Sequence, residues 1–258
     1  MKKTTKLLAL AMGAAMVLSL AACGGSAAPT AKKSDTVKWF NNTYAILTTA
    51  NGMDVDLVGG MKPGVKAKAA AMASLEESWS VTDRETADET LDWLLTEGHR
   101  VGFAEDMDYL TQDGLMDLSD ADAKDVLMNE YGMDEGLAAS YVDAMRAYRK
   151  NGSEAIDAWD YCRAMSLLGW YYLAEYYTLE ETLDKSLEIA TGMQKRYGSW
   201  DEMAESYLDG YTYWAEEDPA DPDSYSAQRK AIYEELKNEK DGCFALDWNT
   251  PLTNDWSK

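Results

Sequence analysis

The chain contains few of the residues that most often carry enzyme chemistry. Its 258 residues include one histidine, His99, and three cysteines, Cys23, Cys162 and Cys243. Common zinc sites need several His or Cys ligands at short spacings, so this composition excludes them. Glycine-rich phosphate loops and the Gly-x-Ser-x-Gly elbow of many hydrolases are also missing. We therefore expect neither a metal nor a cofactor.

The scarcity of cysteine also limits disulfide bonding. Apart from Cys23, only Cys162 and Cys243 remain, and in an exported domain they could form one bridge. Cys162 lies in an apolar helical stretch, where a thiol packs as a small hydrophobic group. This context favours two free thiols over a disulfide.

Positive charge is scarce as well, because 46 Asp and Glu face 24 Lys and Arg, which gives a formal net charge of −22. Such a surface repels phosphate backbones and excludes a nucleic-acid partner. It attracts cations and basic proteins, although it also simply keeps a protein soluble. Two acidic clusters lack the ligand spacing of an EF-hand, so solvated loops are favoured over calcium sites. They are Asp117, Asp120 and Asp122, and Asp218, Asp221 and Asp223.

The N-terminus has the pattern of an export signal. Three lysines precede an apolar run from Leu7 to Leu20, and Leu20-Ala21-Ala22-Cys23 resembles a bacterial lipobox. The sequence predicts a signal peptide at 1–22, lipid on Cys23, a tether at 23–38 and a helical domain at 39–258. We therefore expect an extracytoplasmic protein attached to the bacterial membrane through its lipid. The alternative is a plain secreted protein with a chance cysteine.

Most of the remaining chain has the apolar periodicity of helices. Apolar stripes predict helices over about 66–79, 82–98, 119–132, 137–151, 178–198, 199–214 and 224–239. Capping boxes are predicted at 82–85, 178–181 and 199–202. The stretch 154–177 is apolar on almost every side and is expected to be a buried central helix. The region 37–57 fits helix or strand. The predicted class is all-α, a single multi-helix domain around that central helix.

Three segments together resemble a known family. They are Trp79–Arg84 with Trp93-Leu94 and Gly98–Arg100, Ala158–Arg163, and Ser199–Glu202 with Tyr207, Gly210 and Tyr213-Trp214. Their order and spacing resemble the bacterial domain of unknown function 1266 family over about residues 39–217. The resemblance implies a helical domain from a family without an established biochemical activity.

His99 has a structural and a catalytic interpretation. Gly98 can adopt the left-handed conformation that ends a helix, which would place His99 and Arg100 beside the free carbonyl groups of that helix. Arg100 is then expected to pair with Asp160, and Arg163, three residues further on, could join the network. In the catalytic interpretation, His99 and Asp160 serve a hydrolase-like enzyme, but no nucleophile is marked in the sequence. The structural interpretation is favoured.

Aromatic residues form the second group of candidates. Trp159, Trp200, Tyr207 and Trp214 are expected to be core residues, and the alternative is that they form the walls of a ligand pocket. Gly210, inside the same predicted helix as Tyr207 and Trp214, allows another part of the chain to approach closely.

These observations lead to three functional hypotheses. The favoured one is a lipid-anchored cell-envelope protein with a non-catalytic protein-interaction or ligand-binding domain. The first alternative is an envelope enzyme using His99 and acidic residues. The second is an acidic, immunity-like inhibitor of a basic protein, which the net charge alone suggests. The expected partners are accordingly the membrane, through the lipid, and a small ligand or a basic protein.

Overall fold

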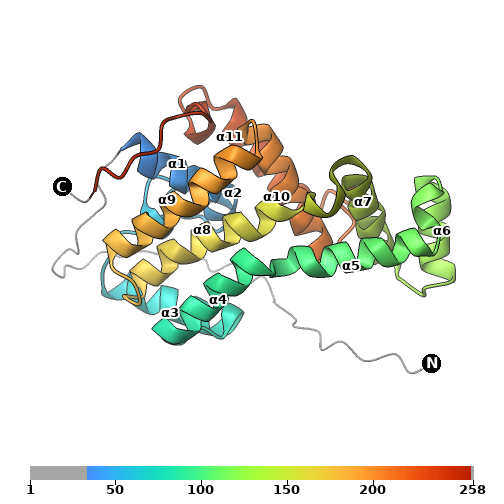
Figure 1. Cartoon of the computed structure of the whole chain (residues 1–258), viewed down its shortest axis with the longest axis horizontal. Coiled ribbons are helices and arrows are strands. Elements are labelled where there is room, and N and C mark those ends of the chain that lie inside the picture. Colours follow the sequence, from blue (N-terminus) through green and yellow to red (C-terminus); the bar gives the residue numbers. More distant parts are fainter. Residues whose placement is uncertain (1–33, 257–258) are drawn as a thin grey trace.

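Helices form all the regular secondary structure in residues 34–256, the part of the chain that the computed structural model describes (Figure 1). The α-helices are α1 (Asp35–Thr43), α2 (Ala45–Ala50), α3 (Val65–Trp79), α4 (Arg84–Thr96), α5 (Gly98–Gln112), α6 (Asp120–Asn129), α7 (Glu135–Asn151), α8 (Asp157–Leu173), α9 (Leu179–Arg196), α10 (Trp200–Ala215) and α11 (Tyr225–Asn238). Short 3₁₀ turns are η1 (Val58–Gly60), η2 (Leu115–Asp117), η3 (Gly152–Glu154) and η4 (Cys243–Ala245). The predicted all-α class is confirmed. The predicted signal peptide and Cys23 lie outside the described residues.

The region that fits helix or strand in the sequence is helical. Ser34 caps α1, its side chain accepting the Val37 amide at 3.2 Å. Trp39 and Phe40 are buried, and this burial fixes α1 against α8 and α9. Helix α1 therefore occupies the last residues of the stretch 23–38 that was predicted to be a tether.

Helix α8 is the central helix, as predicted, although it is shorter than the range 154–177. It packs against α1, α3, α4, α5, α9 and α10, and Figure 1 shows it running through the middle of the molecule. Leu167 and Leu168 on adjacent sides both have no exposed surface. The helix begins after η3 and ends before a left-handed residue, Glu175, with a φ of 64°. Removing apolar surface from water stabilises the fold, and a helix that is buried on every side can do this with all of its faces. This explains why α8 is apolar on almost every side.

The helix starts confirm one capping box and correct two. Thr178 and Glu181 form the predicted reciprocal box at α9. At α4 the box is Asp83 with Thr86, not Thr82 with Glu85, because the helix starts one residue later. At α10 the Ser199 hydroxyl accepts the Glu202 amide, but the Glu202 carboxylate accepts the amide of Gly198.

Helix α5 was not predicted by the sequence. It starts at Gly98, where we expected a helix to end, and it leads to α6 and α7 at one side of the molecule (Figure 1). Phe103, Met107 and Leu110 of α5 belong to a second hydrophobic cluster, separate from the one around α8. Helix α3 matches the predicted range of about 66–79, and its buried face includes Ala71 and Leu75, whereas Met72 is 37% exposed.

Candidate functional site

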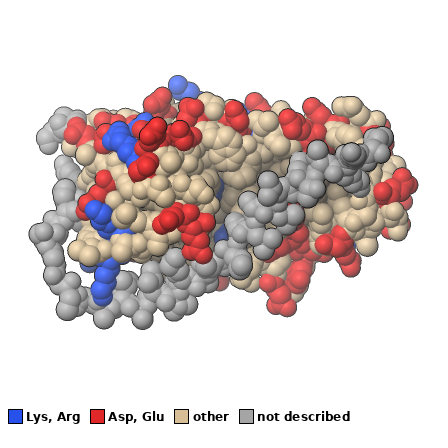
Figure 2. All heavy atoms as spheres, turned by 90° about the horizontal axis from the view of Figure 1, so that it is seen from below, with Lys and Arg blue, Asp and Glu red and all other residues tan. Residues whose placement is uncertain are grey.

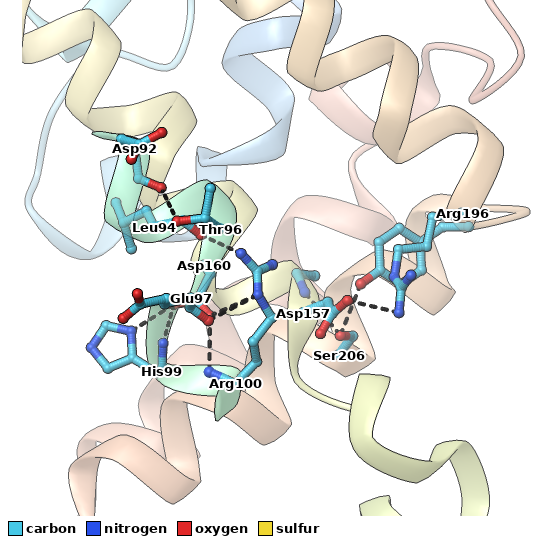
Figure 3. A network of polar contacts seen from close by, with 12 residues as sticks. Asp92, Leu94, Thr96, Glu97, His99, Arg100, Asp157, Asp160, Arg196 and Ser206 are labelled. Carbon is cyan, nitrogen blue, oxygen red and sulfur yellow. Dashed lines mark hydrogen bonds and ion pairs between the residues drawn. The ribbon is translucent and has the colours of Figure 1, made fainter. Parts of the chain in front are cut away.

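Asp160 is the polar centre of the candidate site. This α8 residue has no exposed surface, and its carboxylate accepts the backbone N–H groups of His99 at 3.0 Å and Arg100 at 3.1 Å. Nδ1 of His99 also lies 2.6 Å from Oδ1 of Asp160. An ionised carboxylate only accepts hydrogen bonds, so the ring proton belongs on Nδ1. Figure 3 shows these groups converging on Asp160.

Gly98 makes this convergence possible. It has a φ of +63°, and a Cβ at this position would lie 2.5 Å from Cγ of Asp160. The left-handed conformation was expected, but it joins α4 to α5 without an intervening loop. His99 and Arg100 are therefore in the first turn of α5, where free N–H groups and the positive dipole end attract a carboxylate. This corrects the expectation that His99 lies beside free carbonyl groups.

Arg100 does reach the carbonyl groups at the end of α4. Its Nε donates to the Glu97 carbonyl at 3.1 Å, and its Nη2 donates to the carbonyl of Leu94. The same Nε is 4.0 Å from Oδ2 of Asp160, so the expected pairing with Asp160 is present as a long ion pair. Arg100 thus closes the end of α4 and adds positive charge beside the buried carboxylate.

The ring of His99 faces tryptophans. It lies 5.1 Å from Trp93 and 5.8 Å from Trp159, measured between ring centroids. The side chain is 21% exposed, and within residues 34–256 Nε2 has no hydrogen-bond partner. With a proton on Nδ1 directed at Asp160, the ring leaves its other nitrogen, Nε2, on the free side. The arrangement suits a proton acceptor or a hydrogen bond to a ligand.

Arg163 does not join this network, contrary to the expectation. Its guanidinium lies over two tryptophan rings, 4.8 Å from the centroid of Trp79 and 5.3 Å from that of Trp159. Its Nε is buried and has no hydrogen-bond partner among the described residues. The amides of α5 already occupy the carboxylate of Asp160, so Arg163 packs on the aromatic side of α8 instead.

Trp159 is the centre of an aromatic cluster. Its ring centroid lies 5.5 Å from Tyr207, 5.6 Å from Tyr211 and 5.6 Å from Trp214, all on α10. Gly210 permits this contact, because a Cβ there would lie 3.0 Å from Cγ of Trp159 and closer still to its Cβ. The close approach expected at Gly210 is therefore confirmed.

Three of the four predicted core aromatics are buried, and Trp214 is not. Trp159 and Tyr207 are 2% exposed, as expected for core residues. Trp214 is 37% exposed, so it is a surface residue at the edge of the cluster and not the core residue that was expected. Trp200 is buried but lies elsewhere, with Trp39 at 5.0 Å and Trp248 at 4.7 Å.

Sequence reasoning missed Arg229. It comes from α11, and its guanidinium lies 3.8 Å from the centroid of Tyr211. A single arginine on an amphipathic helix carries no motif, so nothing in the sequence marked it. We define the Trp159 cluster as the following residues from α3, α8, α10 and α11: Trp79, Trp159, Arg163, Tyr207, Tyr211, Trp214 and Arg229.

The family comparison covers the whole site. Residues 74–250 match the model of the family described as "Protein of unknown function (DUF1266)". The chain belongs to the DUF1266 family. The matched region starts later than the resemblance over 39–217 suggested, and it extends far enough to include Arg229 of α11. No curated protein and no solved structure shows a significant similarity to the chain.

Other kinds of site find little support in residues 34–256. This part of the DUF1266 protein has no group of three or more His, Cys, Asp or Glu side chains placed to hold a metal ion. Cys162 and Cys243 are both free, as expected. Among the described helices, none combines the length and apolar character needed to cross a bilayer. Figure 2 shows acidic side chains distributed over the face seen from below, not gathered in one patch.

Proposed function

We propose that this DUF1266 protein is a non-catalytic binding domain, held at the outer face of the bacterial cell membrane by lipid on Cys23. Its ligand binds at the Trp159 cluster. The observation that carries the proposal is a connected set of aromatic and cationic contacts around the buried ring of Trp159. Partly exposed Arg163 lies over Trp159 and Trp79, and partly exposed Arg229 lies over Tyr211, whose ring contacts that of Trp159. Aromatic and cationic side chains that are both preorganised and reachable are typical of ligand sites.

The tryptophans at the surface support the same location. Trp93 and Trp214 are each 37% exposed, and both contact rings that belong to or border the cluster. Tryptophan is enriched where one side of a ring packs in the core and the other meets a partner.

Ligand binding can be tested by native mass spectrometry. The purified chain is incubated with a small-molecule extract of the bacterial envelope, and retained masses are recorded. We expect retention by the wild type and loss in Trp214→Ala, because this truncation removes the edge of the cluster without opening the core. Tyr109→Ala is the matched control, since Tyr109 is an exposed aromatic on α5, at 57%. If the wild type retains nothing, or if both variants behave alike, the proposal fails.

The membrane anchor has a separate test. Metabolic labelling with a radioactive fatty acid is expected to mark the wild type and not Cys23→Ala. Cys243→Ala is the control, because it removes a cysteine that lies in the folded domain. The label must persist in this control. Equal labelling of wild type and Cys23→Ala would refute lipidation at Cys23.

One observation favours a second candidate, a hydrolase-like enzyme. The carboxylate of Asp160 fixes the His99 ring through Nδ1, which leaves Nε2 free to accept a proton. This candidate requires that wild type hydrolyse a panel of nitrophenyl esters and that His99→Gln abolish the turnover while keeping the wild-type unfolding midpoint. Equal turnover in both proteins would remove it.

A further inference from the structure

The buried donors that have no acceptor concentrate in one place. In residues 34–256, six buried side-chain nitrogen or oxygen atoms have no hydrogen-bond partner. They are Nε1 of Trp79 and Trp159, Nε of Arg163 and Arg229, and the hydroxyls of Tyr171 and Tyr207. Five of the six belong to the Trp159 cluster. Indole and guanidinium nitrogens only donate, so four of these five atoms need an acceptor.

The two arginines also lack a negative partner. Neither guanidinium forms an ion pair with a residue in 34–256, although the chain has 46 acidic residues. Burial raises the pKa of Tyr207, and the charges of Arg229 and Arg163 both oppose this rise. Burial lowers the pKa of Arg163 to about 10, and the charge of Arg229 acts in the same direction. Both positive charges are thus near the Tyr207 hydroxyl, where they repel each other.

The stacking of the arginines leaves their N–H edges available. A guanidinium that packs face-on against an aromatic ring presents its donors in its own plane, at the edge. The Cζ atom of Arg163 lies over the rings of Trp79 and Trp159, and that of Arg229 lies over the ring of Tyr211. Both arginines are partly exposed as residues, and their Nε atoms are buried.

We propose that the Trp159 cluster binds an oxyanion, the carboxylate or phosphate group of a small ligand, between Arg163 and Arg229. A planar guanidinium binds a carboxylate or a phosphate through two parallel hydrogen bonds. The indole N–H groups of Trp79 and Trp159 and the hydroxyl of Tyr207 supply further donors. The negative charge removes the repulsion between the two arginines. This inference rests on the proposed binding function and names the chemical class of its ligand.

The net charge of the protein makes the inference specific. A chain with a net charge of −22 repels anions at long range, so general attraction does not hold an oxyanion here. Binding has to come from the local donors, and it should depend on individual arginines more than on salt.

The test uses the indole N–H signals of the ¹⁵N-labelled protein as a direct readout. Sodium phosphate and sodium acetate are titrated separately, with sodium chloride added to keep the ionic strength constant. Trp79→Phe and Trp159→Phe assign the two signals. We expect both indole signals to shift and saturate with phosphate, with acetate or with each, and the stronger probe identifies the preferred oxyanion.

Variants connect the shifts to the arginines. Arg163→Gln and Arg229→Gln are expected to weaken binding about ten-fold or more, since each removes a charged donor pair. Two variants are used so that a folding defect in one leaves the other informative. Arg84→Gln is the matched control, because Arg84 also lies over a tyrosine, 4.9 Å from the Tyr177 centroid, but is ion-paired with Glu181 at 2.9 Å. It should bind like the wild type.

The outcomes separate this inference from the proposed function. Shifts that do not saturate, or that persist in both arginine variants, overturn the oxyanion site. Absence of any shift has the same consequence and means that water satisfies the donors. If the mass-spectrometric test still finds a ligand that depends on Trp214, the proposed function stands and the ligand is not an oxyanion. If no ligand is found by either method, both fail.

Discussion

Replacing Gly98 by alanine should destabilise the fold through Asp160. The added Cβ would lie 2.5 Å from Cγ and 2.9 Å from Oδ1 of the Asp160 carboxyl group. Real Cβ contacts are essentially never shorter than 3.0 Å, so something must move. The carboxylate has no exposed surface and holds three N–H groups from His99 and Arg100, so any movement breaks hydrogen bonds.

Two contributions set the magnitude. A residue with a Cβ in the left-handed region costs about 1–2 kcal/mol. Loss of one hydrogen bond to a charged group costs about 1.5–3 kcal/mol. Gly98→Ala should therefore lower the free energy of unfolding by about 2.5–5 kcal/mol.

Gly114→Ala separates the two contributions. Gly114 has a φ of +79°, but a Cβ there would meet nothing within 4 Å. It should show the conformational cost alone, about 1–2 kcal/mol. Urea unfolding followed by circular dichroism measures both variants. In an Asp160→Ala background, the cost of Gly98→Ala should fall to that of Gly114→Ala. A difference between the single variants below about 1 kcal/mol would refute the reasoning.

Two further predictions concern residues of α10, and the first of them uses Gly192 of α9 for comparison. Gly210→Ala should lower the unfolding midpoint, because the new methyl group would collide with Trp159. Gly192 is also inside a helix, but a Cβ there would meet nothing within 4 Å. Gly192→Ala should therefore raise the free energy of unfolding by about 0.5–1 kcal/mol. Burial, followed by the charges of Asp143 and Glu205, raises the pKa of Asp209 to about 7. The folded state then keeps a proton that the unfolded state loses near pH 4, so the Asp209 contribution to stability falls as pH rises from about 4 to 7. Asp209→Asn should match the wild type at pH 4 and exceed it at pH 8, by at most about 4 kcal/mol.

Each of these predictions has a contrary outcome. Equal changes in Gly210→Ala and Gly192→Ala would mean that α8 and α10 do not pack as closely as described. A gain in Asp209→Asn that is the same at pH 4 and pH 8 would show that the effect does not come from titration of Asp209. Urea titrations at both pH values measure these differences directly.

Local sequence determined most of the helices, though not α5, and the central position of α8. Periodicity and caps act within a few residues, so the Thr178–Glu181 box and the all-round apolar segment were readable without a fold. Gly98 was recognised as a left-handed residue for the same reason. The sequence did not reveal that a second helix starts there, because a glycine with positive φ ends a helix in most contexts.

Tertiary structure alone decided which partners the candidate residues meet. Asp160 and Arg163 share a helix face in the sequence pattern, but the amides of α5 occupy the carboxylate and Arg163 lies on Trp79 and Trp159. Arg229 reaches the same cluster from α11, and it comes 66 positions after Arg163 in the chain. Spacing along one helix specifies which side chains can meet, whereas the choice among charged and aromatic partners depends on what the neighbouring helices bring to the same place.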